Sequence, residues 1–162
     1  MLFYRSRRDE AAGRICAMRF LVALVALAGL VVATLALQVH YSTEMQPCSI
    51  NEKWDCGIVN HSPYAVLGGV PFLGSVPGVK DVPVAAIGMV GYLALAVLAL
   101  MRRRRLVLAG TLAGLAFALY LTHIEKDVLM VWCIYCVTSL GIISLETLLT
   151  LGWALAGQRK TA

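Results

Sequence analysis

Long apolar stretches separated by short polar or charged segments are the main feature of this chain. They run from Phe20 to Leu37, from Pro83 to Met101, from Leu106 to Thr122 and from about Val128 to Ala156, and the last is interrupted only by Glu146. A helix crosses the hydrocarbon core of a bilayer with roughly 20 apolar residues. The pattern therefore predicts four membrane-spanning helices, at about residues 20–40, 83–101, 106–123 and 129–156.

Composition agrees with this interpretation. Of the 162 residues, 60% are apolar and 14% are charged, which is too apolar for an ordinary soluble domain of this size. Only a short turn separates the second and third spans, so these two should form an antiparallel hairpin. We expect an all-α membrane protein, a four-transmembrane-helix bundle in which residues 1–162 form a single integral membrane domain.

The net charge of +5 comes from basic residues at the edges of the apolar stretches. Five arginines precede residue 20, Arg102 to Arg105 fill the turn between the second and third spans, and Arg159 and Lys160 end the chain. By the positive-inside rule these three clusters lie in the cytoplasm. Both termini should then be cytoplasmic, and the loop 42–82 and the link 123–127 should face outward. Because the basic residues are not interleaved with aromatic ones on a soluble face, no nucleic-acid partner is expected.

Two features of these spans allow another interpretation. The first span could be a cleaved signal peptide, although 18 apolar residues are many for such a segment and no clear A-x-A site follows. The G-x-x-x-G spacing of Gly110 and Gly114 could mark a dimer interface. In a four-helix bundle we expect it to pack the third span against its own neighbours.

The long outer loop has the features of an ordered segment. All five prolines lie between Pro47 and Pro83. Ser62 and Pro63 are typical of a helix start and Gly68-Gly69 of a helix end, so a short helix is predicted from about Pro63 to Leu67. The surrounding side chains are apolar: Ile58, Val59, Tyr64, Val66, Leu67, Val70, Phe72 and Leu73. We expect an interfacial lid over the bundle, with an ordinary interfacial loop as the alternative.

Four of the five cysteines collect on the predicted outer side. Cys48 and Cys56 lie in the loop, and Cys133 and Cys136 open the fourth span with C-x-x-C spacing, whereas Cys16 is cytoplasmic, where thiols stay reduced. A zinc site is disfavoured because one pair is spaced C-x7-C and the other enters the membrane. Two structural disulfides are possible, but C-x-x-C closes too small a loop to stabilise much.

A redox pair fits the C-x-x-C better. Positions i and i+3 share one helix face, and the helix N-terminus stabilises a thiolate on the outer cysteine, Cys133. The inner cysteine, Cys136, should point into the bundle. We therefore expect thiol exchange across two cysteine pairs, followed by electron transfer to an acceptor in the membrane.

The order of these motifs resembles the vitamin K epoxide reductase family in its bacterial form, in a version without a fused thioredoxin-like domain. The resemblance covers about residues 15 to 156. It rests on Cys48-x7-Cys56 followed by Ser62-Pro63-Tyr64, on Val82-Pro83-Val84 with Gly88 and Gly91-Tyr92 at the second span, and on Cys133-Ile134-Tyr135-Cys136 at the fourth.

The resemblance implies a quinone of the ubiquinone or menaquinone (vitamin K) type, bound near the outer face beneath the loop. It implies that Cys136 faces the quinone, that Cys133 exchanges with Cys56, and that Cys48 meets a separate DsbA-like thioredoxin-fold protein. The expected quinone contacts are Ser62, Tyr64, Val84, Cys136 and Leu140.

Leu140 stands where animal members have a Tyr that helps to bind vitamin K, and no Asn lies near the start of the second span. Quinone reduction is therefore expected rather than epoxide reduction. The chain would be a thiol:quinone oxidoreductase of the bacterial inner membrane that supports disulfide bond formation.

Ionisable residues in or near the spans raise two further questions. His61, His123 and Glu125 lie at the predicted outer face, where they either relay protons or are simply solvated. Glu146 lies ten residues beyond Cys136, roughly 15 Å deeper in the membrane. It is either the proton-coupling group of a small four-span transporter with structural disulfides or a residue bonded to Thr34, Thr111 or Gln38.

Overall fold

The computed structural model describes residues 2–42, 48, 51–70, 78 and 80–158 of the chain. In this part the regular secondary structure is helical, which confirms the all-α prediction for the residues concerned. The elements are α1 Leu2–Tyr41, α2 Cys56–Asn60, η1 Pro63–Ala65, η2 Leu67–Gly69, α3 Val84–Leu100, α4 Arg104–Ile124, the π-helical turn η3 Glu125–Leu129 and α5 Ile134–Gln158.

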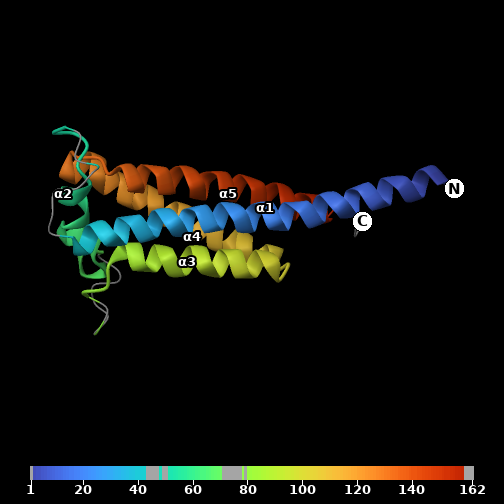
Figure 1. Cartoon of the computed structure of the whole chain (residues 1–162), viewed down its shortest axis with the longest axis horizontal. Coiled ribbons are helices and arrows are strands. Elements are labelled where there is room, and N and C mark those ends of the chain that lie inside the picture. Colours follow the sequence, from blue (N-terminus) through green and yellow to red (C-terminus); the bar gives the residue numbers. More distant parts are fainter. Residues whose placement is uncertain (1, 43–47, 49–50, 71–77, 79, 159–162) are drawn as a thin grey trace.

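Four long helices lie side by side and form one elongated bundle (Figure 1). The short helix α2 lies at one end, while the N-terminal part of α1 extends beyond the other end. Small and apolar side chains fill the centre of the bundle: Val22, Ala23, Ala26, Ala33, Tyr92, Leu95, Ala96, Ala99, Val107, Ile143 and Trp153. Alanines let the helix backbones approach closely, as is usual when helices pack within a membrane.

Three segments are long and apolar enough to cross a membrane, namely Cys16–Tyr41, Arg104–Leu129 and Ile134–Leu155. The apolar helix α3 has 17 residues, and at 1.5 Å per residue it is about 26 Å long, slightly less than the roughly 30 Å of a bilayer core. Large apolar side chains on the outside of these helices are exposed, including Leu24, Val31, Val90 and Leu148. Such a surface suits a membrane protein.

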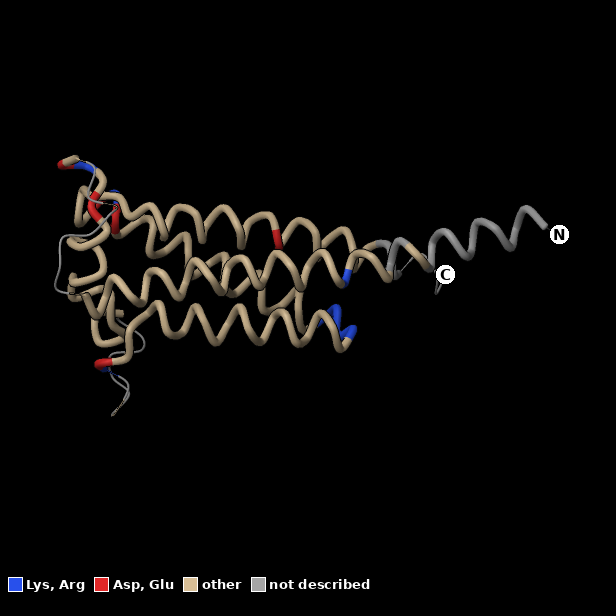
Figure 2. The backbone as a smooth tube through the Cα atoms, in the orientation of Figure 1, with Lys and Arg blue, Asp and Glu red and all other residues tan. Residues whose placement is uncertain are grey.

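The described arginines and the described acidic residues outside α5 lie at opposite ends of the bundle (Figure 2). The arginines of the turn between α3 and α4 lie at the end from which α1 extends, and the described acidic residues outside α5 lie near α2 at the opposite end. This arrangement puts Cys56 and the arginine turn at opposite ends of the helices. The predicted membrane orientation itself stays a prediction.

The link between the third and fourth spans differs from the prediction. Residues 123–127 do not form a loop, because α4 continues into the π-helical turn η3. Met130 then adopts a left-handed conformation with φ 55° and ends the helix, and the N–H of Val131 donates to the carbonyl of Glu125 at 3.2 Å. As a result, α5 begins at Ile134 rather than near 129, and Cys133 directly precedes the helix.

The predicted helix from Pro63 to Leu67 is replaced by two 3₁₀ turns, η1 and η2. Val66 between them is extended, with φ −118° and ψ 154°, because this segment pairs with the residues before α3. The N–H of Leu67 donates to the Val82 carbonyl at 3.0 Å, and that of Gly68 donates to the Lys80 carbonyl at 2.9 Å. The short helix α2 was not predicted. Residues 71–77, with Phe72 and Leu73, lie outside the described part of the predicted lid.

Two glycines of the predicted G-x-x-x-G motif face other helices of the same bundle. A Cβ at Gly110 would lie 2.9 Å from Leu95 Cδ2 of α3, and one at Gly114 would lie 3.3 Å from Ile143 Cδ1 of α5. The expectation that this motif packs the third span against its own neighbours is therefore confirmed.

Candidate functional site

Backbone pairing at the end of the bundle aligns the segments that carry Cys56 and Cys133. The N–H of Trp132 donates to the Lys53 carbonyl at 2.8 Å, and the N–H of Asp55 donates to the Trp132 carbonyl at 3.1 Å. The next residue on each segment is a cysteine. Two cysteines that are 77 positions apart in the sequence (133 − 56) therefore come directly after two segments that are hydrogen-bonded to each other.

The sulfur-bearing residues then meet in one buried cluster. Cys48 and Cys56 are joined by a disulfide, and they share the cluster with Cys133, Val39 and Val59. Cys56 and Cys133 are both fully buried. Cys133 and Cys136 are free thiols. The disulfide therefore uses two of the four sulfurs that a four-thiolate zinc site would need.

Asn60, the last residue of α2, connects the two cysteine pairs. Its side-chain amide donates to the Cys56 carbonyl at 2.8 Å and to Cys133 Sγ at 3.5 Å. Its own carbonyl contacts His40 Nδ1 of α1 at 2.5 Å. Asn60 was not predicted as a site residue, because an amide in a loop gives no sequence signal until the loop is placed against the helices.

The environment of Cys133 favours its thiolate. The Cys136 thiol donates a hydrogen bond to the Cys133 sulfur and lowers the pKa of Cys133 below its ordinary value, against the opposing effect of burial. Backbone N–H groups of Tyr135 and Cys136, at the start of α5, add to this lowering of the pKa. Cys133 is thus the better nucleophile of the pair, as expected for an outer cysteine at a helix start.

Glu125 lies beside the same pair and is buried, with 2% of its surface exposed. Its Oε2 accepts a hydrogen bond from the Cys133 N–H at 3.1 Å, and its carboxyl group also makes a side-chain hydrogen bond with Cys136. The expectation that Glu125 is simply solvated is therefore wrong. The cause is the π-helical turn, which directs residue 125 inward, whereas the neighbouring pair His123 and Asp127 is exposed and joined at 2.6 Å.

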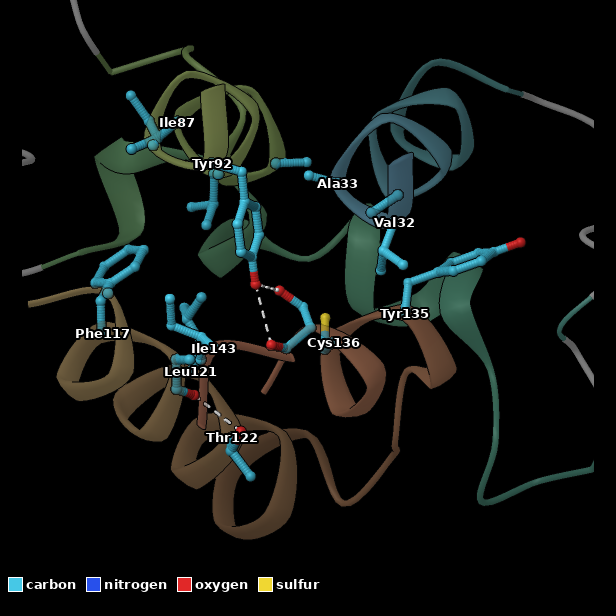
Figure 3. A pocket seen from close by; sticks show the side chains of 18 of the residues that line it. Val32, Ala33, Ile87, Tyr92, Phe117, Leu121, Thr122, Tyr135, Cys136 and Ile143 are labelled. Carbon is cyan, nitrogen blue, oxygen red and sulfur yellow. Dashed lines mark hydrogen bonds between the residues drawn. The ribbon is translucent and has the colours of Figure 1, made fainter. Parts of the chain in front are cut away.

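A cavity of about 470 Å³ opens next to Cys136. Figure 3 shows the Cys136 sulfur directed toward the space bounded by Val32 and Ala33 of α1 and Tyr92 of α3. The wall is mostly apolar and is built from all four long helices and from α2 and η1. Its lining includes Ala36, Val59, Asn60, Ser62, Tyr64, Val84, Gly88, Gly91, Ala94, Leu98, Gly110, Ala113, Phe117, Leu121, Glu125, Ser139 and Ile143.

Tyr92 supplies a polar group in the middle of this apolar wall. Its hydroxyl lies 2.9 Å from Ser139 Oγ and donates to the Ser139 carbonyl at 3.1 Å, as the dashed lines of Figure 3 show. The ring fits against Gly29 of α1, where a Cβ would collide with it. Tyr92 appeared in the sequence motif, but its position in the cavity was not predicted.

The structure brings most of the predicted quinone contacts to this cavity. Ser62, Tyr64, Val84 and Cys136 all line it. Leu140 does not belong to the lining; it packs against the core of the bundle. Its side chain therefore gives no support to the predicted contact.

Glu146 is separate from this site. It is fully buried and is not among the residues that line the cavity. Neither carboxylate oxygen has a hydrogen-bond partner among the described residues, so the predicted bond to Thr34, Thr111 or Gln38 is not formed. Thr34 and Thr111 instead donate to carbonyls of their own helices, at 2.8 Å to Leu30 and 3.1 Å to Leu108.

Comparison with known proteins adds one finding. A sequence model described as the vitamin K epoxide reductase family matches residues 20–151. The matched range contains both cysteine pairs and all the described residues that line the cavity. No curated protein sequence matches the chain.

Proposed function

The chain belongs to the vitamin K epoxide reductase family, and we propose that it is a thiol:quinone oxidoreductase that supports disulfide bond formation. In this proposal Cys48, Cys56, Cys133 and Cys136 are catalytic. Electrons pass from the dithiol of a separate DsbA-like thioredoxin-fold protein through both cysteine pairs to a quinone in the membrane. Membership of the family supports a general redox function at a membrane. The thiol partner and the quinone are our proposal.

One observation carries the proposal, namely the grouping of all four cysteines in one packed cluster between the loop and the cavity. Cys48 is bonded to Cys56, Cys56 lies in the same buried cluster as Cys133, and Cys133 accepts a hydrogen bond from Cys136, which lines the cavity. Thiol–disulfide exchange needs each attacking thiolate to reach the next sulfur. A transporter based on Glu146 would need none of these contacts.

The cavity fits a quinone of the ubiquinone or menaquinone type. The ring and the isoprenoid tail of such a quinone are mostly apolar, as is most of the cavity wall. Pockets for ligands of this kind also carry a few convergent polar groups. Here Ser62, Tyr64, Tyr92 and Ser139, which carry hydroxyl groups, line the same cavity as Cys136. A bound quinone supplies an acceptor for two electrons and two protons.

The described oxidation states match one stage of this relay. The outer pair is a disulfide and the inner pair consists of thiols, as expected once electrons have moved from the outer pair to the inner one. Cys56 then serves as the shuttle to Cys133, and Cys48 as the cysteine that meets the partner. The lowered pKa of Cys133 supports its role as the exchanging thiolate.

We further propose that the domain spans a bacterial inner membrane four times, with both termini in the cytoplasm. The Arg102 to Arg105 turn favours this orientation by the positive-inside rule. The cysteine pairs then face the periplasm, where disulfides persist. DsbA has a reduction potential near −120 mV, so only an acceptor well above that value keeps it oxidised, which favours a quinone.

Replacing Cys136 by Ser tests the relay. Purified protein is mixed with a reduced DsbA-like protein and with ubiquinone or menaquinone, and quinone reduction is followed by absorbance. The Cys136→Ser variant should lose quinone reduction and accumulate mixed disulfides, because Cys133 has no inner partner. Cys16→Ser, which changes a cysteine outside the relay, is the matched control and should retain the full rate. Full turnover by Cys136→Ser would refute the proposal.

A further inference from the structure

We propose that Glu125 is a catalytic acid–base residue, which accepts the proton of the Cys136 thiol and passes it to the acceptor in the cavity. This inference rests on the proposed function. It concerns a residue outside the cysteine motifs, at the end of α4.

The carboxyl group lies between the inner cysteine pair and the cavity. It makes a side-chain hydrogen bond with Cys136, the thiol that opens on the cavity, and Glu125 itself lines the cavity. Among the described lining residues it is the only one with a charged side chain. Among the described residues, Glu125 is therefore the only carboxylate that can exchange a proton within the cavity.

The position of the carboxylate is fixed by the backbone. The Cys133 N–H donates to Oε2 at 3.1 Å, so one oxygen is held at the start of α5. The carbonyl of Glu125 is held as well, because it accepts the N–H of Val131 at 3.2 Å. A π-helical turn of this kind is frequent at functional sites, since it redirects one side chain out of the regular helix pattern.

Proton accounting shows what such a group contributes. Oxidation of the Cys133–Cys136 dithiol forms one S–S bond and releases two electrons and two protons, and a quinone that becomes a hydroquinone takes up the same number of each. In our proposal Glu125 carries the Cys136 proton. The Cys133 proton leaves to the outer water, since the lowered pKa of Cys133 favours its thiolate, and the same water supplies the second proton of the hydroquinone.

A purely structural role is the alternative, because a carboxylate that accepts the Cys133 N–H could simply hold the start of α5. Glu125→Gln separates the two roles. The Gln amide oxygen still accepts the N–H, but the amide takes up no proton. Glu125→Asp keeps the acid on a shorter side chain, and Glu52→Gln is the matched control on an exposed loop residue.

The first measurement needs no quinone. In quinone-depleted protein with Cys16→Ser and Cys133→Ala, the alkylation rate of Cys136 is measured between pH 6 and pH 10, so that Cys136 is the reporting thiol. Because the negative charge of the Glu125 carboxylate disfavours a second negative charge on Cys136, Glu125→Gln should raise the Cys136 rate about 10-fold at neutral pH, whereas Glu125→Asp, which keeps the charge, should stay close to the parent protein. The other described groups at this site are Cys133, removed in this background, the non-titrating Asn60, and Tyr64, Tyr92 and Tyr135, which line the same cavity. Lys126 and Asp127 of the same turn, and His123 just before it, are exposed.

The second measurement is quinone reduction by the otherwise native protein. General acid–base catalysis typically contributes 10²- to 10⁴-fold, so Glu125→Gln should lose about 100-fold while still forming mixed disulfides with the partner. An unchanged alkylation profile and an unchanged quinone rate in Glu125→Gln would overturn this inference alone. Absence of quinone reduction by the wild-type protein would instead refute the proposed function. If Glu125→Gln does not fold, Glu125→Ser takes its place, and an unchanged alkylation profile together with an unchanged quinone rate in that variant overturns the inference.

Discussion

The side-chain amide of Asn60 donates a hydrogen bond to Cys133 Sγ at 3.5 Å, although 73 positions separate the two residues. The contact joins the short helix α2 to the start of α5. The same amide group also donates to the Cys56 carbonyl, so one side chain holds the loop cysteine and the helix cysteine in register. Asn60 thus links the placement of the two pairs to the charge state of Cys133.

Removing the Asn60 amide should raise the pKa of Cys133. A hydrogen bond to a charged group contributes roughly 1.5 kcal/mol, and about 1.4 kcal/mol corresponds to one pKa unit, so Asn60→Ala should shift the pKa of Cys133 upward by about one unit. The alkylation rate of Cys133, measured against pH in quinone-depleted protein, should then reach half of its maximum at higher pH. Asn60→Asp should shift the midpoint further, because a negative charge replaces a donor. An unchanged midpoint in both variants would contradict the assigned hydrogen bond.

The cluster of Cys56 and Cys133 predicts a specific crosslink. In the double variant Cys48→Ser, Cys136→Ser, the two remaining outer cysteines should form a disulfide on mild oxidation, because both lie buried in one cluster. The product is detected by mass mapping. The matched control is Cys48→Ser, Cys133→Ser, in which Cys56 and Cys136 should crosslink more slowly. Faster crosslinking in this control would reverse the proposed order of exchange.

The contact between Gly29 and Tyr92 predicts a packing defect. A Cβ at Gly29 would collide with the Tyr92 ring, and overpacking of this kind costs roughly 1–3 kcal/mol. Gly29→Ala should therefore lower the unfolding midpoint in detergent. Gly141→Ala is the matched control, because a Cβ there meets nothing within 4 Å, and Ala favours a helix interior over Gly by about 1 kcal/mol. Equal midpoints for the two variants would show that the ring moves aside without cost.

The sequence predicts much of this fold because its strongest signals are local. Apolar stretches of the right length mark the long helices, and the C-x-x-C pair next to such a stretch marks the redox chemistry. Ser62, Tyr64 and Val84 were found through their order in a family pattern, and the cavity includes all three. Leu140 was expected from the same pattern, but its side chain faces the core, because a fixed spacing along a helix does not determine which face meets the cavity.

Asn60 and Glu125 could not be assigned from the sequence for a different reason. Both acquire their contacts through pairing between distant segments, above all the hydrogen bonds between Trp132 and residues 53 and 55. Glu125 also depends on the π-helical turn at the end of α4, which shifts the helical register without a clear sequence signal. The cysteines themselves were therefore predictable, whereas the side chains that tune them were not.

The unpaired carboxyl group of Glu146 predicts a variant that is more stable than the natural protein. Glu146 is fully buried within α5 and neither oxygen has a hydrogen-bond partner in the described part of the chain, and burial of an unsatisfied polar group costs on the order of 1–3 kcal/mol. Glu146→Leu removes this cost while keeping a side chain of similar volume, so the unfolding midpoint in detergent should rise. The rate of quinone reduction should stay within about twofold of wild type, because Glu146 does not line the cavity. Loss of that rate with a raised midpoint would instead assign Glu146 to the reaction, and a lowered midpoint would mean that its carboxyl group has a partner in the membrane-embedded protein.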